Sequence, residues 1–255
     1  MSTLRVNNLC MKVGEGASAR VIQQGVNFEI EQGRIFAIMG SSGCGKSTLL
    51  RHLVGLAKPA GGQVLYDNED FWSLDDAGQQ RWRARFGMLF QSAALWTSMS
   101  VLDNVCVPLQ IKENLSRDQC RDRAMELLSW VGMKDAADRM PSDLSGGMKK
   151  RAGLARAIAG EPAFLFLDEP SAGLDPINSK RLDLLILDIR ERTGAAILMV
   201  SHELPSLFAI ADDGIFLDAD SHRPLGRGSP AELRDHCEHR TVQAFLHREE
   251  LADET

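Results

Sequence analysis

One glycine-rich segment constrains the fold of this chain more than any other feature. The segment Gly40-Ser-Ser-Gly-Cys-Gly-Lys-Ser47 fits the pattern GxxxxGK[ST] and stands between an apolar run at 35–39 and the helix-like stretch KSTLLRHLVGL. Glycines let consecutive backbone N–H groups curve around phosphate oxygens, and the start of a helix adds a partial positive charge. The order strand, loop, helix therefore predicts a phosphate-binding loop (P-loop). Its expected members are Gly40, Ser41, Ser42, Gly43, Cys44, Gly45, Lys46, Ser47 and Thr48.

Two side chains of this loop suggest its ligands. In this pattern the Lys46 ammonium reaches the β- and γ-phosphates of a nucleotide, and the Ser47 hydroxyl is a ligand of Mg²⁺. The alternative is a glycine-rich turn that only connects a strand to a helix. The strand-loop-helix context disfavours that alternative, so we expect ATP and Mg²⁺ to bind here.

A pair of acids follows another apolar run. Asp168 and Glu169 come directly after the strand-like run at 164–167. In P-loop enzymes the first acid holds Mg²⁺, often through water, and the second polarises the attacking water as a general base. The structural alternative is a strand that simply ends in a polar turn before Pro170. Paired with the P-loop, the two acids favour ATP hydrolysis.

The apolar pattern predicts the architecture around these motifs. Continuous apolar runs of strand length are typical of a parallel sheet buried on both faces. The chain has four, at 35–39, 86–90, 164–167 and 195–200. Alternation at 26–30 instead indicates a half-buried antiparallel strand. Helical patterns lie between the runs, so we expect an α/β fold: a P-loop NTPase (RecA-like) core with an N-terminal antiparallel β subdomain.

The stretch 92–160 interrupts this alternation and is mainly helical in pattern. Ser116 and Gln119 match a capping box, followed by apolar residues at helical spacing. We therefore predict a single domain, 1–255, with an inserted helical subdomain at 92–160. Its other parts are the α/β core with the antiparallel subdomain (1–91 and 161–225) and a C-terminal extension (226–255) with a turn and one or two surface helices.

Composition narrows the class of partner. The 255 residues carry a formal net charge of −6, which argues against a nucleic-acid-coating protein. The five cysteines are dispersed, as expected of reduced thiols rather than of a disulfide framework. No basic-then-apolar leader is evident, and no apolar run approaches the roughly 20 residues of a membrane helix. Work at a membrane would therefore require a partner.

A third glycine motif carries a family resemblance. Leu144-Ser145-Gly146-Gly147-Met148 stands at the start of a helix-like segment, where it would form a second phosphate site. Taken with the P-loop and the acids, this motif resembles the signature of the ATP-binding cassette (ABC) family, and the resemblance covers most of the chain. It implies a head-to-tail dimer, in which Ser145, Gly146, Gly147 and Met148 of one subunit close on the ATP held by the other.

The resemblance also assigns isolated residues. Gln91, after the run at 86–90, matches the Q-loop glutamine that meets Mg²⁺ and water. Asp175 matches the D-loop residue near the opposite subunit, and His202 matches the switch histidine at the γ-phosphate. Individually each has a structural reading, as a surface glutamine or a structural histidine. The implied catalytic set is Glu169, His202, Gln91 and Lys46; the implied metal ligands are Ser47, Gln91 and Asp168.

Two departures from the family pattern stand out. The family's adenine-stacking aromatic residue is missing from 10–21, where Met11 or Val13 are the apolar candidates for its place, and Met148 replaces the commoner glutamine. Met148, the basic run at 149–151 and the segment 89–104 resemble the MlaF branch of MCE-type phospholipid transporters. A solvated helix face is the alternative for the basic run.

That branch implies a set of partners. They are a second copy of the chain, transmembrane permease subunits, an MCE-domain lipid-binding protein and a small STAS-type regulator, with no nucleic acid. The chain would lie on the cytoplasmic face of the inner (plasma) membrane, held by its permease. A groove near Gln91, with Leu95 and Trp96 as exposed apolar candidates, would receive a permease helix; core packing is the alternative for Trp96. Other ABC systems (small-solute import or export, lipoprotein release, cell division), a soluble non-transport ABC ATPase and a P-loop kinase are the rival functions.

Overall fold

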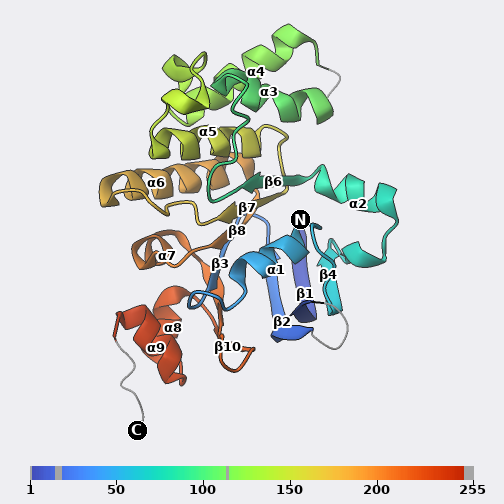
Figure 1. Ribbon diagram of the computed structural model, residues 1–255, viewed down its shortest axis with the longest axis vertical. Coiled ribbons are helices and arrows are strands. Elements are labelled where there is room, and N and C mark those ends of the chain that lie inside the picture. Colours follow the sequence, from blue (N-terminus) through green and yellow to red (C-terminus); the bar gives the residue numbers. More distant parts are fainter. Residues whose placement is uncertain (1, 15–18, 113–114, 250–255) are drawn as a thin grey trace.

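The computed structural model describes residues 2–14, 19–112 and 115–249, and its strands form two sheets (Figure 1). The first sheet is antiparallel, in the order β2-β1-β4-β5. Its strands are β1 (Thr3–Val13), β2 (Arg20–Glu31), β4 (Gly61–Tyr66) and β5 (Glu69–Asp70). The alternation expected in β2 is confirmed, because Val26, Phe28 and Ile30 are buried while Asn27 is exposed.

The second sheet contains the four expected apolar runs as neighbouring parallel strands. Its order is β10-β9-β3-β8-β7-β6, and only the pair β10–β9 is antiparallel. The strands are β3 (Ile35–Met39), β6 (Phe86–Leu89), β7 (Phe164–Asp168), β8 (Ala196–Val200), β9 (Asp213–Leu217) and β10 (Pro224–Arg227). Parallel strands end at the same edge of a sheet, so the loops after β3, β7 and β8 meet there.

Nine α-helices are seen in the described part of the chain. They are α1 (Lys46–Leu53), α2 (Asp76–Arg83), α3 (Val101–Lys112), α4 (Arg117–Trp130), α5 (Gly146–Ile158), α6 (Pro176–Thr193), α7 (Leu204–Ile210), α8 (Pro230–His236) and α9 (Arg240–His247). The capping box at Ser116 and Gln119 is confirmed at the start of α4. Helices α3, α4 and α5 lie in the segment expected to be helical, and Figure 1 shows α5 between the α3–α4 pair and the sheet.

Two apolar clusters cover the two faces of the parallel sheet. In β3, Ile35, Ala37 and Met39 face one cluster, while Phe36 and Ile38 face the other. The first cluster joins the sheet to helices α3–α9, and the second joins it to α1 and the antiparallel sheet. This double burial explains why the strands of the parallel sheet read as continuous apolar runs. The expected α/β core with an antiparallel β subdomain is thus confirmed.

The C-terminal helices are more than surface additions. On α9, Val242 is fully buried and Leu246 is only 3% exposed, and both belong to the first cluster. One face of α9 therefore completes the core, while Arg240 and His247 at its two ends are exposed, as in a helix at the surface of the protein. No helix among the described residues is both long and apolar enough to span a membrane.

Candidate functional site

A cavity of about 610 Å³ opens at the edge where β3, β7 and β8 end. It brings together eight P-loop residues and four residues from distant parts of the sequence. The lining residues are Gly40, Ser41, Ser42, Gly43, Gly45, Lys46, Ser47, Thr48, Gln91, Glu169, His202 and Phe245. All four residues expected to be catalytic (Lys46, Gln91, Glu169 and His202) line this one cavity.

The P-loop backbone adopts conformations that favour glycine. Gly40, Gly43 and Gly45 have φ angles of 140°, 82° and 102°, and a Cβ on Gly40 would collide with the carbonyl of Leu217 on β9. Lys46 folds back over the loop, where its Nζ donates to the carbonyls of Gly40 (2.7 Å) and Ser41 (2.8 Å). The loop thus places a cation and the N-terminus of α1 at one point, an arrangement that attracts a phosphate group.

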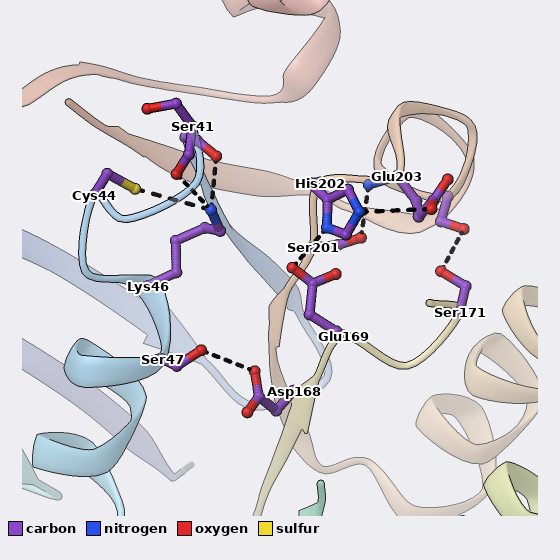
Figure 2. A network of polar contacts seen from close by, with 12 residues as sticks. Ser41, Cys44, Lys46, Ser47, Asp168, Glu169, Ser171, Ser201, His202 and Glu203 are labelled. Carbon is purple, nitrogen blue, oxygen red and sulfur yellow. Dashed lines mark hydrogen bonds and ion pairs between the residues drawn. The ribbon is translucent and has the colours of Figure 1, made fainter. Parts of the chain in front are cut away.

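Ser47 and Asp168 form a pair of oxygen donors beside the cavity. The Ser47 hydroxyl lies 3.3 Å from Oδ1 of Asp168 (Figure 2). Burial raises the pKa of Asp168, and the nearby charge of Glu169 raises it further, while the Ser47 hydrogen bond lowers it. Among the described residues no cluster of three or more His, Cys, Asp or Glu could hold a metal. Mg²⁺ prefers oxygen ligands and takes most of them from phosphate and water, so this pair fits it.

Glu169 is held in an unusual position at the carboxyl end of β7. Its φ of 49° lies in the left-handed region, which is uncommon for a residue with a side chain. Oε1 lies 2.8 Å from Nδ1 of His202, whereas Oε2 is buried without a hydrogen-bond partner among the described residues (Figure 2). A buried carboxylate oxygen without a partner is costly unless another group supplies a hydrogen bond. The arrangement suits a carboxylate that accepts a proton from a water molecule in the cavity.

The signature residues and Asp175 do not line this cavity. Ser145 is the N-cap of α5, where its Oγ accepts from the Met148 backbone N–H at 3.3 Å. Asp175 is the N-cap of α6, and hydrogen bonds from Asn178 and Ile177 hold the pKa of its carboxyl below its usual range. These helix starts are neighbours, since a Cβ on Gly147 would lie 3.7 Å from Leu174. Their place outside the cavity is compatible with the expected contact to a second subunit's nucleotide.

Three further expected residues occupy distinct environments. Cys44 is buried, with its Sγ 3.9 Å from the Lys46 ammonium, so it contacts the P-loop lysine without lining the cavity. Met11 is also fully buried, and its Cε would lie 3.3 Å from a Cβ on Gly45, whereas Val13 is 55% exposed. Of the two candidates for the missing aromatic position, only Val13 presents apolar surface.

Phe245 is a cavity residue that the sequence analysis did not single out. It lies on α9, some 200 positions after the P-loop, and its ring packs edge-on against Phe216 of β9 with centroids 5.2 Å apart. The only local signal was the apolar face of 240–247, where Val242 and Leu246 stand four positions apart. That pattern predicts a packed helix but not what it packs against.

Comparisons with known proteins identify the family. The family model described as ABC transporter matches residues 23–172. MlaF, the intermembrane phospholipid transport system ATP-binding protein of Haemophilus influenzae, is 38% identical over 240 residues, which cover 94% of this chain and 89% of that protein. The methionine import ATP-binding protein MetN 2 of Pseudomonas syringae pv. tomato is 37% identical over 228 residues, covering 89% of this chain and 68% of that protein.

One solved structure similar to this chain is a dimer. An ATP-binding cassette captured as a dimer in a post-hydrolysis state, bound to ADP and Pi, has a TM-score of 0.80 and 29% sequence identity; the match covers 89% of this chain and 98% of that one. The P-loop cavity, the acids at the end of β7 and these relatives agree, and the chain belongs to the ABC transporter family as an ATP-hydrolysing subunit.

Proposed function

We propose that this subunit drives a bacterial transporter that moves phospholipid between membranes with an MCE-domain partner and a small STAS-type regulator. The supporting observation is coverage rather than identity. The MlaF relative aligns with the chain over 89% of its own length, whereas the chain covers only 68% of the methionine import protein, which is similar at nearly the same identity. Import of a small solute is the second candidate, supported by the methionine import relatives.

Two copies of the chain would form the catalytic unit, head to tail. In one copy the P-loop cavity would bind ATP, and residues 145–148 at the start of α5 in the other copy would cover the nucleotide. Two features support this arrangement. The start of α5 lies outside the P-loop cavity of its own chain, and a related cassette has been solved as a dimer.

The chemistry would be divided among four side chains. Glu169 would take a proton from the water that attacks the γ-phosphate, and its 2.8 Å contact with His202 would keep the carboxylate facing the cavity. Lys46 and His202 would stabilise the charge that develops on the phosphate oxygens, since positioning and charge dominate phosphoryl transfer. Ser47 and Asp168, with Gln91, would hold Mg²⁺, which supplies neutralising charge at the β- and γ-phosphates.

An apolar groove offers a place for the permease. It measures about 570 Å³ and contains Phe90, Trp96 and Ile111, which are 37%, 55% and 81% exposed. The exposure of Trp96 rules out simple core packing for this residue. Leu95, expected to be exposed, is instead half-buried against the core, because the loop turns it inward. Gln91 lines the P-loop cavity, and its neighbour in sequence, Phe90, lines the groove, so a permease helix in the groove would be coupled to the nucleotide through these two residues.

Purification of the tagged chain from its own host in mild detergent tests this proposal. Mass spectrometry would identify the proteins and lipids that accompany it. We expect a multi-span permease in stoichiometric amount, an MCE-domain protein and bound phospholipid. A different permease without lipid would replace phospholipid transport by another ABC system. Absence of any membrane protein, with ATP binding intact, would contradict a transport role.

A further inference from the structure

A buried lysine outside the P-loop cavity contacts the backbone of Glu169. Lys150 lies on the second turn of α5 and is only 5% exposed. Its ammonium donates a 2.7 Å hydrogen bond to the carbonyl oxygen of Glu169. Burial of an ammonium is unfavourable unless nearby groups compensate for lost water. The negative charges of Glu169 and Asp168 act on it and supply part of that compensation.

The contact lies at a residue with an unfavourable backbone conformation. Glu169 has a φ of 49°, a conformation that persists only when surrounding interactions impose it. Its N–H donates to the carbonyl of Val200 at 2.9 Å, and its carbonyl accepts from the N–H of Ala172 at 3.3 Å and from Lys150. Of these three hydrogen bonds, only the one from Lys150 comes from a side chain, and only it reaches Glu169 from a helix.

That helix begins at the signature. α5 is 13 residues long, has Ser145 as its N-cap, and presents Gly146 and Gly147 to Leu174 of the D-loop. Lys150 stands five residues after the N-cap, less than two turns away. A short, hydrogen-bonded helix moves as a unit. A displacement of its first turn would therefore move the ammonium that holds Glu169.

We propose that Lys150 is a positioning residue for ATP hydrolysis: it holds the backbone of Glu169 so that the carboxylate faces the cavity, and it links that carboxylate to the N-terminal turn of α5. The link to a nucleotide on a second copy rests on the proposed dimer. Lys150 itself touches neither nucleotide nor water in this scheme. Its loss should lower the rate of the chemical step and leave nucleotide binding intact.

Substitution of Lys150 in the full chain tests this inference. Lys150→Met keeps the length of the side chain and removes the donors. We expect kcat for ATP hydrolysis to fall about 10- to 100-fold, because small misplacements of a catalytic group have effects of that order. The Kd for ATP should stay within about twofold of the wild-type value. Lys150→Arg, which keeps a buried donor, should restore most of kcat, and Lys150→Gln should lie between them.

A double substitution separates positioning from general loss of structure. In the Glu169→Gln background, adding Lys150→Met should lower the residual turnover by no more than about twofold, since the carboxylate it positions is absent. Lys134→Met, on an exposed lysine of the short helix at 134–136, is the matched control and should keep wild-type kcat. Thermal unfolding of each variant would show that the proteins compared are folded; if Lys150→Met does not fold, Lys150→Gln and Lys150→Arg carry the test.

Two results would overturn the inference. One is a folded Lys150→Met, or Lys150→Gln in its place, that retains kcat within about twofold. The other is a loss that appears in the Kd for ATP instead. Neither result depends on the transported substrate. Failure to find a permease would remove the transport proposal and leave the effect of Lys150 on turnover measurable in the full chain.

Discussion

At the scale of single residues, Glu169 is held in an energetically unfavourable arrangement. The left-handed backbone and the buried Oε2 both carry a free-energy cost, and Glu169 lines the P-loop cavity. His202 contacts Oε1 at 2.8 Å, whereas Oε2 is buried and has no hydrogen-bond partner among the described residues. Asp168, one residue earlier, turns instead toward Ser47. The adjacent acids thus have different partners, because β7 ends at Asp168 and the left-handed backbone of Glu169 breaks the extended conformation of the strand.

Glu169→Gln tests the role of this carboxylate. The amide keeps the shape of the side chain but cannot accept a proton, so we expect kcat to fall about 100- to 10,000-fold while ATP binding persists. Steady-state phosphate release and equilibrium ATP binding measure the two effects, and size-exclusion chromatography with ATP would show a trapped dimer. Glu191→Gln, on an exposed glutamate of α6, is the control. Near-normal turnover in Glu169→Gln would assign the base to another residue.

His52 predicts a pH dependence of stability. It is 3% exposed, its Nδ1 donates to the Ala57 carbonyl at 2.6 Å, and its Nε2 is buried without a partner among the described residues. Burial lowers its pKa below the usual 6.5. Below pH 6.5 the unfolded chain therefore binds more protons than the folded one. The free energy of unfolding should decline as pH falls from 6.5 toward the folded-state pKa, by about 1.4 kcal/mol per unit of pKa difference.

Urea unfolding at pH 7.5 and pH 5.0 measures this effect. His52→Gln cannot be protonated, so the decrease in stability between the two pH values should be smaller than in the wild type. His222→Gln, at an exposed histidine, should leave the decrease unchanged. Equal decreases in all three proteins would show that His52 is not the group responsible.

At the scale of elements, α5 connects parts of the site that the sequence keeps apart. Besides Lys150, its Arg156 donates to the carbonyls of Ala93 and Ala94 in the loop after β6, at 2.8 and 2.7 Å. Both alanines have positive φ, so this contact, like that of Lys150, supports a left-handed backbone. The P-loop and the acids could be predicted because each motif is local. The contacts of α5 could not, because they depend on how the helix packs.

Gly87→Ala tests the packing of α5 on β6. A Cβ at Gly87 would collide with the carbonyl of Ala157, a backbone atom that cannot turn away. Overpacking of this kind should lower the free energy of unfolding by about 1–3 kcal/mol, measured by urea denaturation. Gly61→Ala is the matched strand control: its Cβ would lie 3.8 Å from Cys10, an ordinary contact, so the change should stay within about 0.5 kcal/mol. Similar stability of both variants would mean that α5 moves aside readily.

At the scale of the whole molecule, the parallel sheet joins two apolar clusters, and the chain crosses between them repeatedly. The burial of β3, β7 and β8 on both faces could be predicted from their continuous apolar runs. The return of residues 240–247 to the first cluster was not, because an amphipathic helix near a terminus fits a core, a partner or a surface equally well. In the structure this helix packs on the core: Phe245 lines the P-loop cavity and Val242 belongs to the first cluster. The last helix therefore links nucleotide site and core.

Leu246→Ala tests this link at the level of global stability. Leu246 is 3% exposed within the first cluster, so truncation should lower the free energy of unfolding by about 2–5 kcal/mol, through lost burial and the cavity left behind. Leu184→Ala, on a leucine of α6 that is 58% exposed, should cost no more than about 0.5 kcal/mol. Urea unfolding followed by circular dichroism would show one cooperative transition shifted to lower urea if α9 folds with the core. If α9 were a separate appendage, Leu246→Ala would match the Leu184 control, because its unfolding would leave the main transition unchanged.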